Sequence, residues 1–382
     1  MTGKPMVYLD NAAATRICPS AANAMMRAMT EDYGNPSSRH EMGARARTAL
    51  QRNRETVAGA LECLPEELYF TSGGTESDNW AILAAAQAGK RYGRHIITTA
   101  LEHAAVLETT KELSRQGFEI TYLPPDSGGS VSLEALKASL RPDTILVSMM
   151  LVNNETGTEL PVRKAAEAIR EAGSPALLHT DAAQGFLKVP FSAKTLGAQL
   201  ITISGHKIRG PKGIGALYVK KGVKLPPLLW GGGQENGLRP GTEPTPLIAG
   251  FAAACALGRE RMGADAAHMQ ALKEYSVQRL EKALPSARKI GKGEAPHILC
   301  LTLPGYRSEV LVRVLSDLGV CVSAGSACHR GRASHVLASM KLSPAEREGA
   351  FRVSFSPDNT QEEADALVDA LVRAAGMIMP SL

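Results

Sequence analysis

The feature that most constrains this chain is a regular alternation of short apolar runs with longer helical patterns. Seven short apolar runs predict strands, at residues 68–71, 95–99, 119–123, 144–151, 176–180, 200–204 and 215–219. Helical periodicity fills the stretches between many of them, at residues 76–87, 104–116, 133–140 and 162–172. Strands that alternate with helices form a mainly parallel sheet covered by helices on both faces. We therefore predict an α/β fold whose ligands bind at the carboxyl ends of the strands.

The pattern changes after about Pro246. A long helical stretch at residues 246–284 leads into a smaller α+β region that ends near Leu382. We expect a domain boundary in the glycine-rich stretch 231–241 or within the helix that follows it. The chain has no internal repeat, low-complexity tract or flexible linker that would divide it further.

Composition and charge argue against several classes of function. Aromatic residues make up 4% of the chain, too few for the stacking platforms that bind single-stranded nucleic acid. The net charge of +5 is mild, and Lys and Arg are spread along the chain, so we expect no nucleic-acid partner. The longest near-continuous apolar run, residues 247–257, is too short to span a bilayer, and residues 1–11 hold no signal-peptide pattern. We expect a soluble, cytoplasmic protein without membrane contact.

Six cysteines are scattered along the chain, at positions 18, 63, 255, 300, 321 and 328. No pair has the CxxC spacing typical of zinc sites, so we expect no bound metal, and the scatter fits a reducing compartment. The first five lie in apolar, helical or strand contexts and are expected to be structural. Cys328 instead lies in a run of small residues followed by His329, Arg330 and Arg332. Nearby cations lower the pKa of a thiol, which makes Cys328 the candidate nucleophile.

Two residues at predicted strand ends suggest a carbonyl cofactor. Lys207 follows the run 200–204 and precedes the glycine-rich loop 210–213. Lysine forms Schiff bases with carbonyl cofactors, although most loop lysines are simply solvated. Asp181 follows another strand, where a carboxylate can keep a pyridinium nitrogen protonated, although an aspartate there is commonly a helix N-cap.

Two further strand ends suggest a phosphate site and a functional imidazole. The segment 70–77 is a strand, a Gly-Gly turn and a helix start, whose amides with the Thr75 and Ser77 hydroxyls form a phosphate cradle. His103 ends another strand, where an imidazole can stack on a ring or move protons, although a lone histidine is usually structural. Each signal is weak alone. Because all four recur in order at strand ends, we predict a site for a phosphorylated carbonyl cofactor.

Six motifs resemble those of one family. They are YLDNAA at residues 8–13, YGNPSS at 33–38, NNETG at 153–157, SGHK at 204–207, GGGQE at 231–235 and GSAC at 325–328. Together they resemble the cysteine desulfurases of the iron–sulfur-assembly type, within the class V aminotransferase superfamily of fold-type I pyridoxal-phosphate enzymes. The match runs in one order from about residue 7 to about residue 375. It implies an N-terminal arm at 1–15 that joins the small domain, a large domain at 16–250, and a small α+β domain at 251–382.

The resemblance implies a cofactor role for each matching residue. Lys207 would hold pyridoxal 5'-phosphate as a Schiff base. Asp181 would pair with the pyridine nitrogen, Gln184 with the ring hydroxyl, and His103 would stack on the ring. The remaining cofactor contacts, most of them to the phosphate, would come from Gly74, Thr75, Asn154, Ser204 and His206. Thr242 would reach the phosphate of the partner subunit, which implies a homodimer.

The resemblance also implies the reaction. L-Cysteine would be the substrate, with its carboxylate held by Asn154 and Arg352, a task that suits a guanidinium. The hypothesis is that Lys207 takes the α-proton, His103 moves a proton to or from the substrate thiol, and the Cys328 thiolate attacks the substrate sulfur. The products would be L-alanine and a Cys328 persulfide. The persulfide would pass to a sulfur-acceptor or scaffold protein in iron–sulfur cluster or thio-cofactor biosynthesis.

Three features depart from the family pattern. The turn 239–241 reads Arg-Pro-Gly where a Ser commonly follows the Arg, and Pro240 lacks an N–H for a phosphate contact. The segment after Cys328 is about two residues shorter and more basic than in housekeeping members, and the chain stops soon after its last predicted helix. We therefore expect an unusual acceptor, with an acidic surface that faces Arg330 and Arg332.

Other functions remain alternatives. A selenocysteine lyase or another β-eliminating member of the superfamily would share every cofactor residue. An ordinary aminotransferase or a kynureninase-like enzyme would not need Cys328. A non-catalytic cluster scaffold or sulfur-binding module would keep the fold without the Schiff base, but the presence of both Lys207 and Asp181 argues against it.

Overall fold

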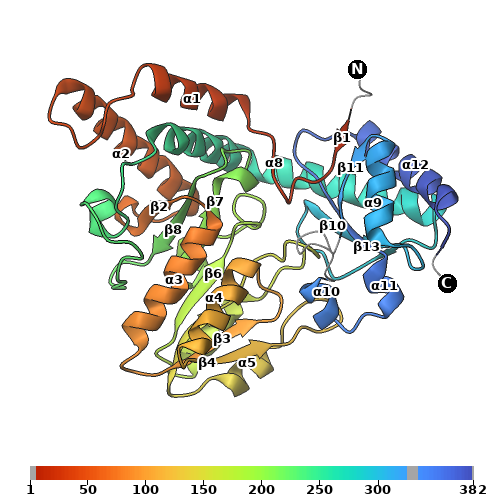
Figure 1. The fold of residues 1–382 in the computed structure, drawn as a ribbon, viewed down its shortest axis with the longest axis horizontal. Helices are drawn as coiled ribbons and strands as arrows, with labels where there is room; N and C mark the ends of the chain where they lie inside the picture. The colour runs from red at the N-terminus through yellow and green to blue at the C-terminus, as the bar shows by residue number, and fades with distance from the viewer. Residues whose placement is uncertain (1–5, 325–333, 381–382) are drawn as a thin grey trace.

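A seven-stranded sheet forms the centre of the larger part of the molecule (Figure 1). The structure is a computed structural model that describes residues 6–324 and 334–380. The strands, in order across the sheet, are β2 (Leu68–Thr71), β8 (Gly215–Val219), β7 (Leu200–Ser204), β6 (Leu177–Asp181), β5 (Thr144–Ser148), β3 (His95–Thr99) and β4 (Glu119–Leu123). Neighbours from β7 to β4 are parallel, and β8 is antiparallel to both β2 and β7. The predicted mainly parallel sheet is confirmed.

Two strand bounds differ from the prediction. The run 144–151 is a regular strand only as far as Ser148, because the chain then leaves the ladder and Leu151 keeps one backbone hydrogen bond to Asp181 O, of 2.9 Å. The run 176–180 forms β6 one residue later, so that Asp181 is the last residue of the strand. Both differences lie at the carboxyl edge of the sheet, where the chain turns toward the cavity described below.

Helices cover both faces of this sheet. They are α1 (Pro19–Thr30), α2 (Glu41–Leu61), α3 (Gly74–Gly89), α4 (Ala104–Arg115), α5 (Leu133–Ser139), α6 (Val162–Glu171) and α7 (Ala193–Leu196), with the 3-10 helices η1 (Pro65–Glu67), η2 (Gly205–Lys207) and η3 (Gln234–Gly237). Ile96 and Leu146 pack around Trp80 of α3, whereas the next residues along each strand, Ile97 and Val147, enter the opposite core. Side chains alternate across a strand, so burial on both faces explains the continuous apolar runs.

One helix belongs to both parts of the molecule. Helix α8 (Thr245–Ala283) is 39 residues long, close to the predicted stretch 246–284, and packs against α1, α2 and α12 (Gln361–Met377). Figure 1 shows it running from the large sheet to the C-terminal region. Within the described ranges, no helix has the length and apolar character needed to cross a bilayer.

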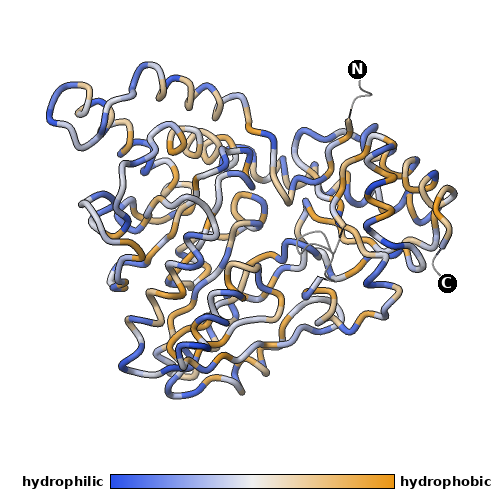
Figure 2. The backbone as a smooth tube through the Cα atoms, in the orientation of Figure 1, coloured by the Kyte–Doolittle hydropathy of each residue, from blue (hydrophilic) through white to orange (hydrophobic). Residues whose placement is uncertain are grey.

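The C-terminal region has its own sheet and core. The sheet is antiparallel, in the order β12 (Ser323–Ala324), β13 (Ala350–Ser354), β10 (Ile298–Thr302) and β9 (Arg288–Lys289). The helices beside it are α9 (Ser308–Asp317), α10 (His335–Ser339), α11 (Pro344–Glu348) and α12. Leu299, Phe351 and Leu367 belong to a core cluster separate from those of the large sheet. Figure 2 shows hydrophobic residues along the strands and inner helix faces of both regions, which confirms a smaller α+β part.

The N-terminal segment lies with the C-terminal region. Strand β1 (Val7–Tyr8) pairs in parallel with β11 (Val320–Cys321), and Leu9 is fully buried in the C-terminal core. The backbone N–H of Asn11 donates to Ser354 O of β13 at 3.3 Å. The division into an arm, a large domain and a small domain stays a prediction, and its boundary at residue 250 falls inside α8.

Candidate active site

A cavity of about 490 Å³ opens where the strand ends of the large sheet face the C-terminal sheet. It is lined by ten of the residues singled out in the sequence: Gly74, Thr75, His103, Asn154, Asp181, Gln184, Ser204, His206, Lys207 and Arg352. The other three are not part of it. Thr242 lines a different hollow, the buried Ser77 hydroxyl lies 2.7 Å from Thr71 Oγ1, and Cys328 lies outside the described residues. The arrangement follows from topology. Parallel strands end at one edge of a sheet, so residues after β3, β5, β6 and β7 meet there.

The amine of Lys207 contacts the N-terminal segment. Its Nζ donates to Ala12 O at 2.7 Å and to Ala13 O at 2.8 Å. Gln184 donates from Nε2 to the same Ala12 O at 2.8 Å, and its Oε1 lies 3.2 Å from His297 Nε2. The carbonyls of the N-terminal segment therefore hold both the predicted Schiff-base lysine and the predicted partner of the ring hydroxyl. Neither contact had a signal in the sequence.

Asp181 is a buried carboxylate with a second carboxylate nearby. One of its oxygens accepts from Ala183 N at 2.9 Å. Burial raises its pKa, while the charges of His103 and Lys207 lower it. Asp78, on α3, is also buried, and burial and the Asp181 charge raise its pKa well above the usual range. Burial therefore favours a neutral Asp78, whereas the charges of His103 and Lys207 favour an ionised Asp181.

A neutral histidine, His179, lies next to these carboxyls and contacts Asp78. His179 precedes Asp181 by two residues on β6, and burial lowers its pKa to about 3. Its Nδ1 lies 2.9 Å from Ser148 Oγ, and its Nε2 lies 3.1 Å from Thr202 Oγ1 and 3.5 Å from Asp78 Oδ1. Because the ring is neutral, the contact with Asp78 is a polar contact and not an ion pair. Sequence analysis missed both residues, although Asp78 lies one helical turn after Gly74.

The start of α3 is suited to an anion. Gly73 precedes the helix with φ of 151° and provides no side-chain cap, so the first helical amides have no capping acceptor from this residue. A Cβ at Gly73 would meet no other atom within 4 Å, so this side of the turn faces open space. Ser204 Oγ lies 3.1 Å from His206 Nδ1 beside it. Hydroxyl, imidazole and helix amides together provide the donors that a phosphate needs.

His103 and Glu102 lie side by side at the exit of β3. His103 Nδ1 accepts from Ala105 N at 3.1 Å, which leaves Nε2 as the ring nitrogen that can exchange a proton at the cavity. Glu102 is fully buried, and burial raises its pKa to about 8. Its Oε1 accepts from Thr99 Oγ1 and from Met150 N, both at 2.8 Å. A protonated Glu102 thus ties the exit of β3 to the exit of β5.

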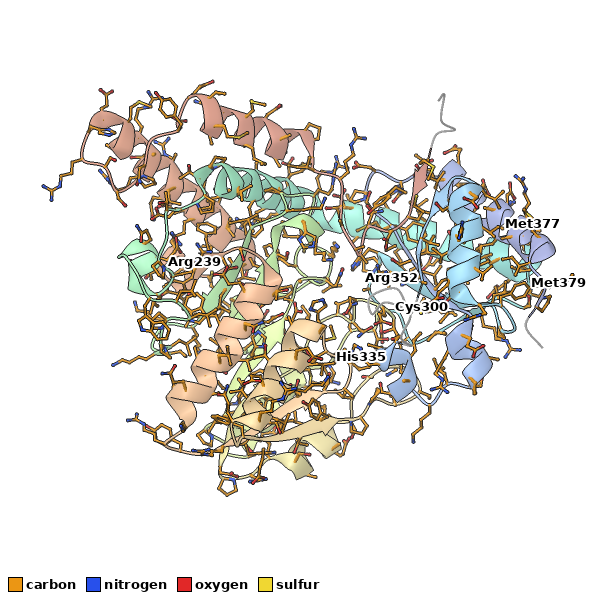
Figure 3. All side chains as sticks on the ribbon, viewed as in Figure 1. Arg239, Cys300, His335, Arg352, Met377 and Met379 are labelled. Atoms are coloured by element: carbon orange, nitrogen blue, oxygen red, sulfur yellow. The ribbon has the colours of Figure 1, made fainter. Side chains whose placement is uncertain are left out.

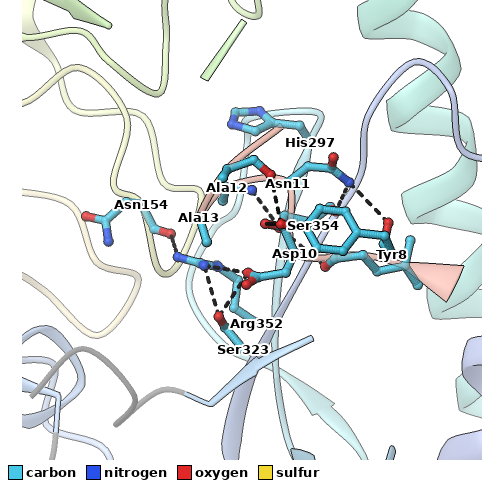
Figure 4. Close-up of polar contacts among 12 residues, drawn as sticks. Tyr8, Asp10, Asn11, Ala12, Ala13, Asn154, His297, Ser323, Arg352 and Ser354 are labelled. Carbon is cyan, nitrogen blue, oxygen red and sulfur yellow. Dashed lines mark hydrogen bonds and ion pairs between the residues drawn. The ribbon is translucent and has the colours of Figure 1, made fainter. Parts of the chain in front are cut away.

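Arg352 enters the cavity from β13 (Figure 4). Its Nη1 donates to Asn154 O at 2.8 Å, and its Nη2 donates to Asp10 Oδ1 at 2.8 Å and to Ser323 Oγ at 3.2 Å. In Figure 4 the Asn154 carbonyl faces Arg352, and its side-chain amide points the other way. The structure therefore brings together the two residues predicted to hold a carboxylate, and adds Asp10, which sequence analysis did not single out.

The side of the cavity near Lys207 is electropositive. Lys188 is buried, and burial, followed by the charges of Lys207 and Arg352, lowers its pKa to about 7. Its Nζ has no hydrogen-bond partner in the part of the chain that the structure describes. Burial and the Lys207 charge lower the pKa of His206 to about 4, and burial lowers that of His297 further. The two imidazoles are therefore neutral, and the positive charge of Lys207 and Arg352 favours anionic ligands on this side.

The predicted phosphate ligand Thr242 lies elsewhere. It lines a hollow of about 250 Å³ together with Phe70, Gly213 and Arg239. Arg239 is held by Glu76, with Nε to Oε1 at 2.8 Å and Nη2 to Oε2 at 3.2 Å. Figure 3 shows Arg239 well apart from Arg352. Within one chain Thr242 therefore does not reach the cavity, and its predicted role in a partner subunit stays a prediction.

Four of the five cysteines within the described ranges, Cys63, Cys255, Cys300 and Cys321, are poor nucleophiles. Burial raises the pKa of Cys63 and of Cys300 to about 12, and that of Cys255 well above its usual value. Burial and Asp10 raise the pKa of Cys321. None of the described cysteines is paired in a disulfide. These thiols stay protonated at neutral pH, as expected for structural residues.

Described residues on both sides of Cys328 lie at the cavity. Ser323, five positions before it, lines the cavity beside Arg352. After it, the Ser334 hydroxyl caps α10 and donates to the buried Glu155. His335 Nε2 contacts Glu102 O at 2.9 Å. The chain therefore leaves the described part at one rim of the cavity and returns near the exit of β3.

Comparisons with known proteins agree with this geometry. The aminotransferase class-V family model matches residues 7–367. The cysteine desulfurase IscS of Methanosarcina thermophila is 40% identical over 374 residues, which cover 97% of this chain and 92% of that protein. A NifS-like protein of known structure has a TM-score of 0.93 and 39% identity, and covers 98% of this chain and 100% of that one. A structure of SspA in complex with cysteine has a TM-score of 0.80 and 33% identity, with coverage of 92% and 99%.

Proposed function

This chain belongs to the class V aminotransferase family, and from that premise we propose that it is a cysteine desulfurase that converts L-cysteine to L-alanine and a persulfide on Cys328. The observation that carries the proposal is the convergence of Lys207, Asp181, His103 and Arg352 on one cavity. These side chains come from four different strand ends or strands, and each is of the type that one part of the reaction needs. Relatives named cysteine desulfurase extend over nearly the whole chain.

We propose pyridoxal 5'-phosphate as the cofactor, and the cavity fits it. Lys207 would hold it covalently, Asp181 would face its ring nitrogen, and Gln184 its ring hydroxyl. The uncapped start of α3 at Gly74 and Thr75, with Ser204 and His206, would hold the phosphate. When bound, the cofactor supplies an electron sink for the carbon that bears the amino group. An ionised Asp181, favoured by the charges of His103 and Lys207, would keep the ring nitrogen protonated.

The residues of this chain would then move the protons. Lys207 takes the proton from the substrate α-carbon, since its amine lies at the cavity in contact with Ala12 O and Ala13 O. His103 exchanges a proton with the substrate thiol through Nε2, because Nδ1 is engaged by Ala105 N. Arg352 binds the substrate carboxylate, and Asn154 shapes the same part of the cavity. No metal takes part in this proposal.

Sulfur transfer is assigned to Cys328, which lies outside the described residues. Its thiolate attacks the substrate sulfur, so that an S–S bond forms and the C–S bond breaks. The electron pair of the C–S bond stays with the carbon fragment, which is protonated and leaves as L-alanine. Ser323, before Cys328, lines the cavity, and His335, after it, contacts Glu102, the neighbour of His103, which supports this assignment.

The assembly and the sulfur acceptor are also proposals. We infer a homodimer in which Thr242 serves the phosphate site of the partner subunit, because Thr242 lines a hollow outside this chain's own cavity. The acceptor would be a protein of the iron–sulfur cluster or thio-cofactor pathways, with an acidic surface toward Arg330 and Arg332. The cytoplasm is the proposed compartment, because unpaired, scattered cysteines suit a reducing environment.

The test is the release of sulfide and L-alanine from L-cysteine in the presence of a thiol reductant. Wild-type protein should release the two in equal amounts, and Cys328→Ala should lose both while keeping the absorption of the bound cofactor. Release that survives in Cys328→Ala would point to β-elimination. Turnover of selenocysteine but not of cysteine would favour a selenocysteine lyase. A chain without cofactor absorption would contradict the enzymatic proposal altogether.

A further inference from the structure

The guanidinium of Arg352 is held on two sides before any ligand binds. It is almost buried, with 9% of its side chain exposed. Nη1 donates to Asn154 O, while Nη2 donates to both Asp10 Oδ1 and Ser323 Oγ. Nε has no partner among residues 6–324 and 334–380. The N–H groups of Arg352 without a partner are therefore that of Nε, which is buried, and the second one of Nη1 (Figure 4).

Among the three groups that accept hydrogen bonds from Arg352, the Asp10 carboxylate is the charged one. Within the described part of the chain it is the single carboxylate that forms an ion pair with Arg352, at 2.8 Å. Ser323 Oγ donates to the same oxygen, Oδ1, at 2.9 Å. Arginine has several rotatable bonds and loses about 2 kcal/mol of rotamer entropy when it is fixed. A charged partner that fixes it in the free protein removes that cost from ligand binding.

Asp10 is itself fixed by the C-terminal core. Leu9 N donates to Cys321 O at 2.9 Å, and Ser354 N donates to Leu9 O at 2.7 Å. Asp10 forms a parallel bridge with Ser354, two residues after Arg352 on β13. The backbone on both sides of Asp10 is therefore hydrogen-bonded to the C-terminal region. This makes Asp10 a rigid support and not a mobile side chain that meets Arg352 by chance.

The N-terminal segment that contains Asp10 continues to the amine of Lys207. Ala12 O and Ala13 O, two and three positions after Asp10, accept from Lys207 Nζ. Residues 10–13 thus join the guanidinium at one end of the cavity to the amine at the other. The distance between the carboxylate site and the α-carbon site is set by this short piece of backbone.

We propose that Asp10 is the positioning residue for recognition of the substrate carboxylate, acting through Arg352. Asp10 holds Nη2, so that the guanidinium keeps one orientation at a fixed place relative to Lys207. This inference rests on the proposed function, because it takes the α-carboxylate of the amino acid as the ligand of Arg352. Asp10 itself contacts neither the substrate nor the reacting atoms.

The test compares Asp10→Asn with wild type in the holoenzyme, using two probes. One probe is 3-mercaptopropionate, which has the carboxylate and thiol of cysteine but no amine, and the other is cysteamine, which has the thiol and amine but no carboxylate. We expect the dissociation constant of 3-mercaptopropionate to rise about tenfold, the effect of one charge-assisted hydrogen bond, and that of cysteamine to change less than about twofold. In steady state, KM for L-cysteine should rise about tenfold with kcat nearly unchanged.

Two further variants separate positioning from general damage. Asp358→Asn removes another aspartate that pairs with an arginine, Arg209, at 2.8 Å, and should leave both probes unaffected. Arg352→Gln should weaken 3-mercaptopropionate binding, and adding Asp10→Asn to it should cause no further loss, because Asp10 acts only through Arg352. Thermal unfolding and cofactor absorption check that each variant is folded and loaded.

Four outcomes would overturn the inference. Tighter binding of 3-mercaptopropionate by Asp10→Asn would mean that Asp10 competes with the ligand for Arg352. An equal loss for both probes would mean a general structural role. Weaker binding of 3-mercaptopropionate by Arg352→Gln together with unchanged binding by Asp10→Asn would show that Arg352 binds the carboxylate without help from Asp10. Unchanged binding by Arg352→Gln would show that Arg352 does not bind the carboxylate, and the inference about Asp10 would fail with it.

Discussion

The two rims of the cavity are built in different ways. The sheet rim, His103, Asp181 and Lys207, consists of residues that follow parallel strands, and each stands within a short motif next to its own strand. The arm rim, Ala12, Ala13, Ser323 and Arg352, is assembled from three segments, and Asp10, which supports Arg352 from behind, lies 342 positions before it in the chain. The sheet rim depends on strand order alone. The arm rim depends on how the N-terminal segment packs into the C-terminal core.

This difference predicts how the two rims respond to mutation. Residues of the sheet rim lie at the ends of strands buried on both faces, so changing them affects chemistry more than folding. Residues that support the arm rim belong to a smaller core with hydrogen bonds from distant segments. Changing them affects stability and ligand geometry together. Four predictions, from the largest effect to the smallest, test this contrast.

Lys207→Ala tests the sheet rim. We expect the rate of alanine formation to fall about 10²- to 10⁴-fold, because a positioned proton-transfer group is lost, with little change in unfolding temperature. Lys212→Ala, an exposed lysine in the next loop, is the matched control and should retain activity. The measurement is alanine release under saturating L-cysteine. A large drop in stability in Lys207→Ala would remove the contrast between the rims.

Leu9→Ala tests the arm rim. Leu9 is fully buried in the C-terminal core, so its truncation should lower the free energy of unfolding by about 2–5 kcal/mol. The denaturant midpoint would report this change. Leu64→Ala, at a leucine that is 46% exposed, should cost far less. If Leu9→Ala were no worse than Leu64→Ala, the N-terminal segment would not be part of that core.

Lys188→Met tests the electropositive wall below Lys207. The pKa of Lys188 is lowered to about 7 in the folded protein, so between pH 7 and its usual pKa of 10.5 the unfolded chain binds more protons. Wild-type stability should therefore rise with pH across this window. We expect Lys188→Met to be more stable at pH 7 by about 1–3 kcal/mol, with the difference shrinking toward pH 10.

The control for this change is Lys194→Met, at an exposed lysine close in sequence. Its unfolding free energy should match that of wild type at every pH within about 0.5 kcal/mol. Urea unfolding at a series of pH values measures both variants. A Lys188→Met difference that does not depend on pH would show that the buried amine does not titrate in this window.

Glu102→Gln, at the exit of β3, should have the smallest effect of the four substitutions. The pKa of Glu102 is raised from 4.5 to about 8, so its stabilising contribution is complete below pH 4.5 and is lost as pH rises through 8. Gln mimics the protonated acid and still accepts from Thr99 and Met150. We expect a change below about 1 kcal/mol at pH 4.5 and a relative gain for the variant that develops as pH rises from 4.5 to 8. Loss of stability at pH 6 would indicate an ionised Glu102.

The sheet rim could be predicted because its signals are local. Lys207 and Asp181 each follow an apolar run, and the rule that parallel strands end together was sufficient to group them. Sequence analysis did not identify Asp78 and Glu102 as parts of the site, although both are adjacent in sequence to predicted residues. A buried carboxyl on a helix or loop cannot be distinguished from a solvated one until the fold is known. Thr242 was predicted to serve the phosphate of a partner subunit, and its place in another hollow of this chain leaves that prediction untested.

The sequence by itself determined the elements and their alternation, because the two-residue and 3.6-residue periods of apolar side chains are local properties of the chain. It also determined which residues stand at strand ends. Only the tertiary structure decided that Asp10, Asn154 and Ser323 surround Arg352, and that Ala12 lies against Lys207. Those neighbours come together through the packing of distant segments into shared cores, which no local pattern records.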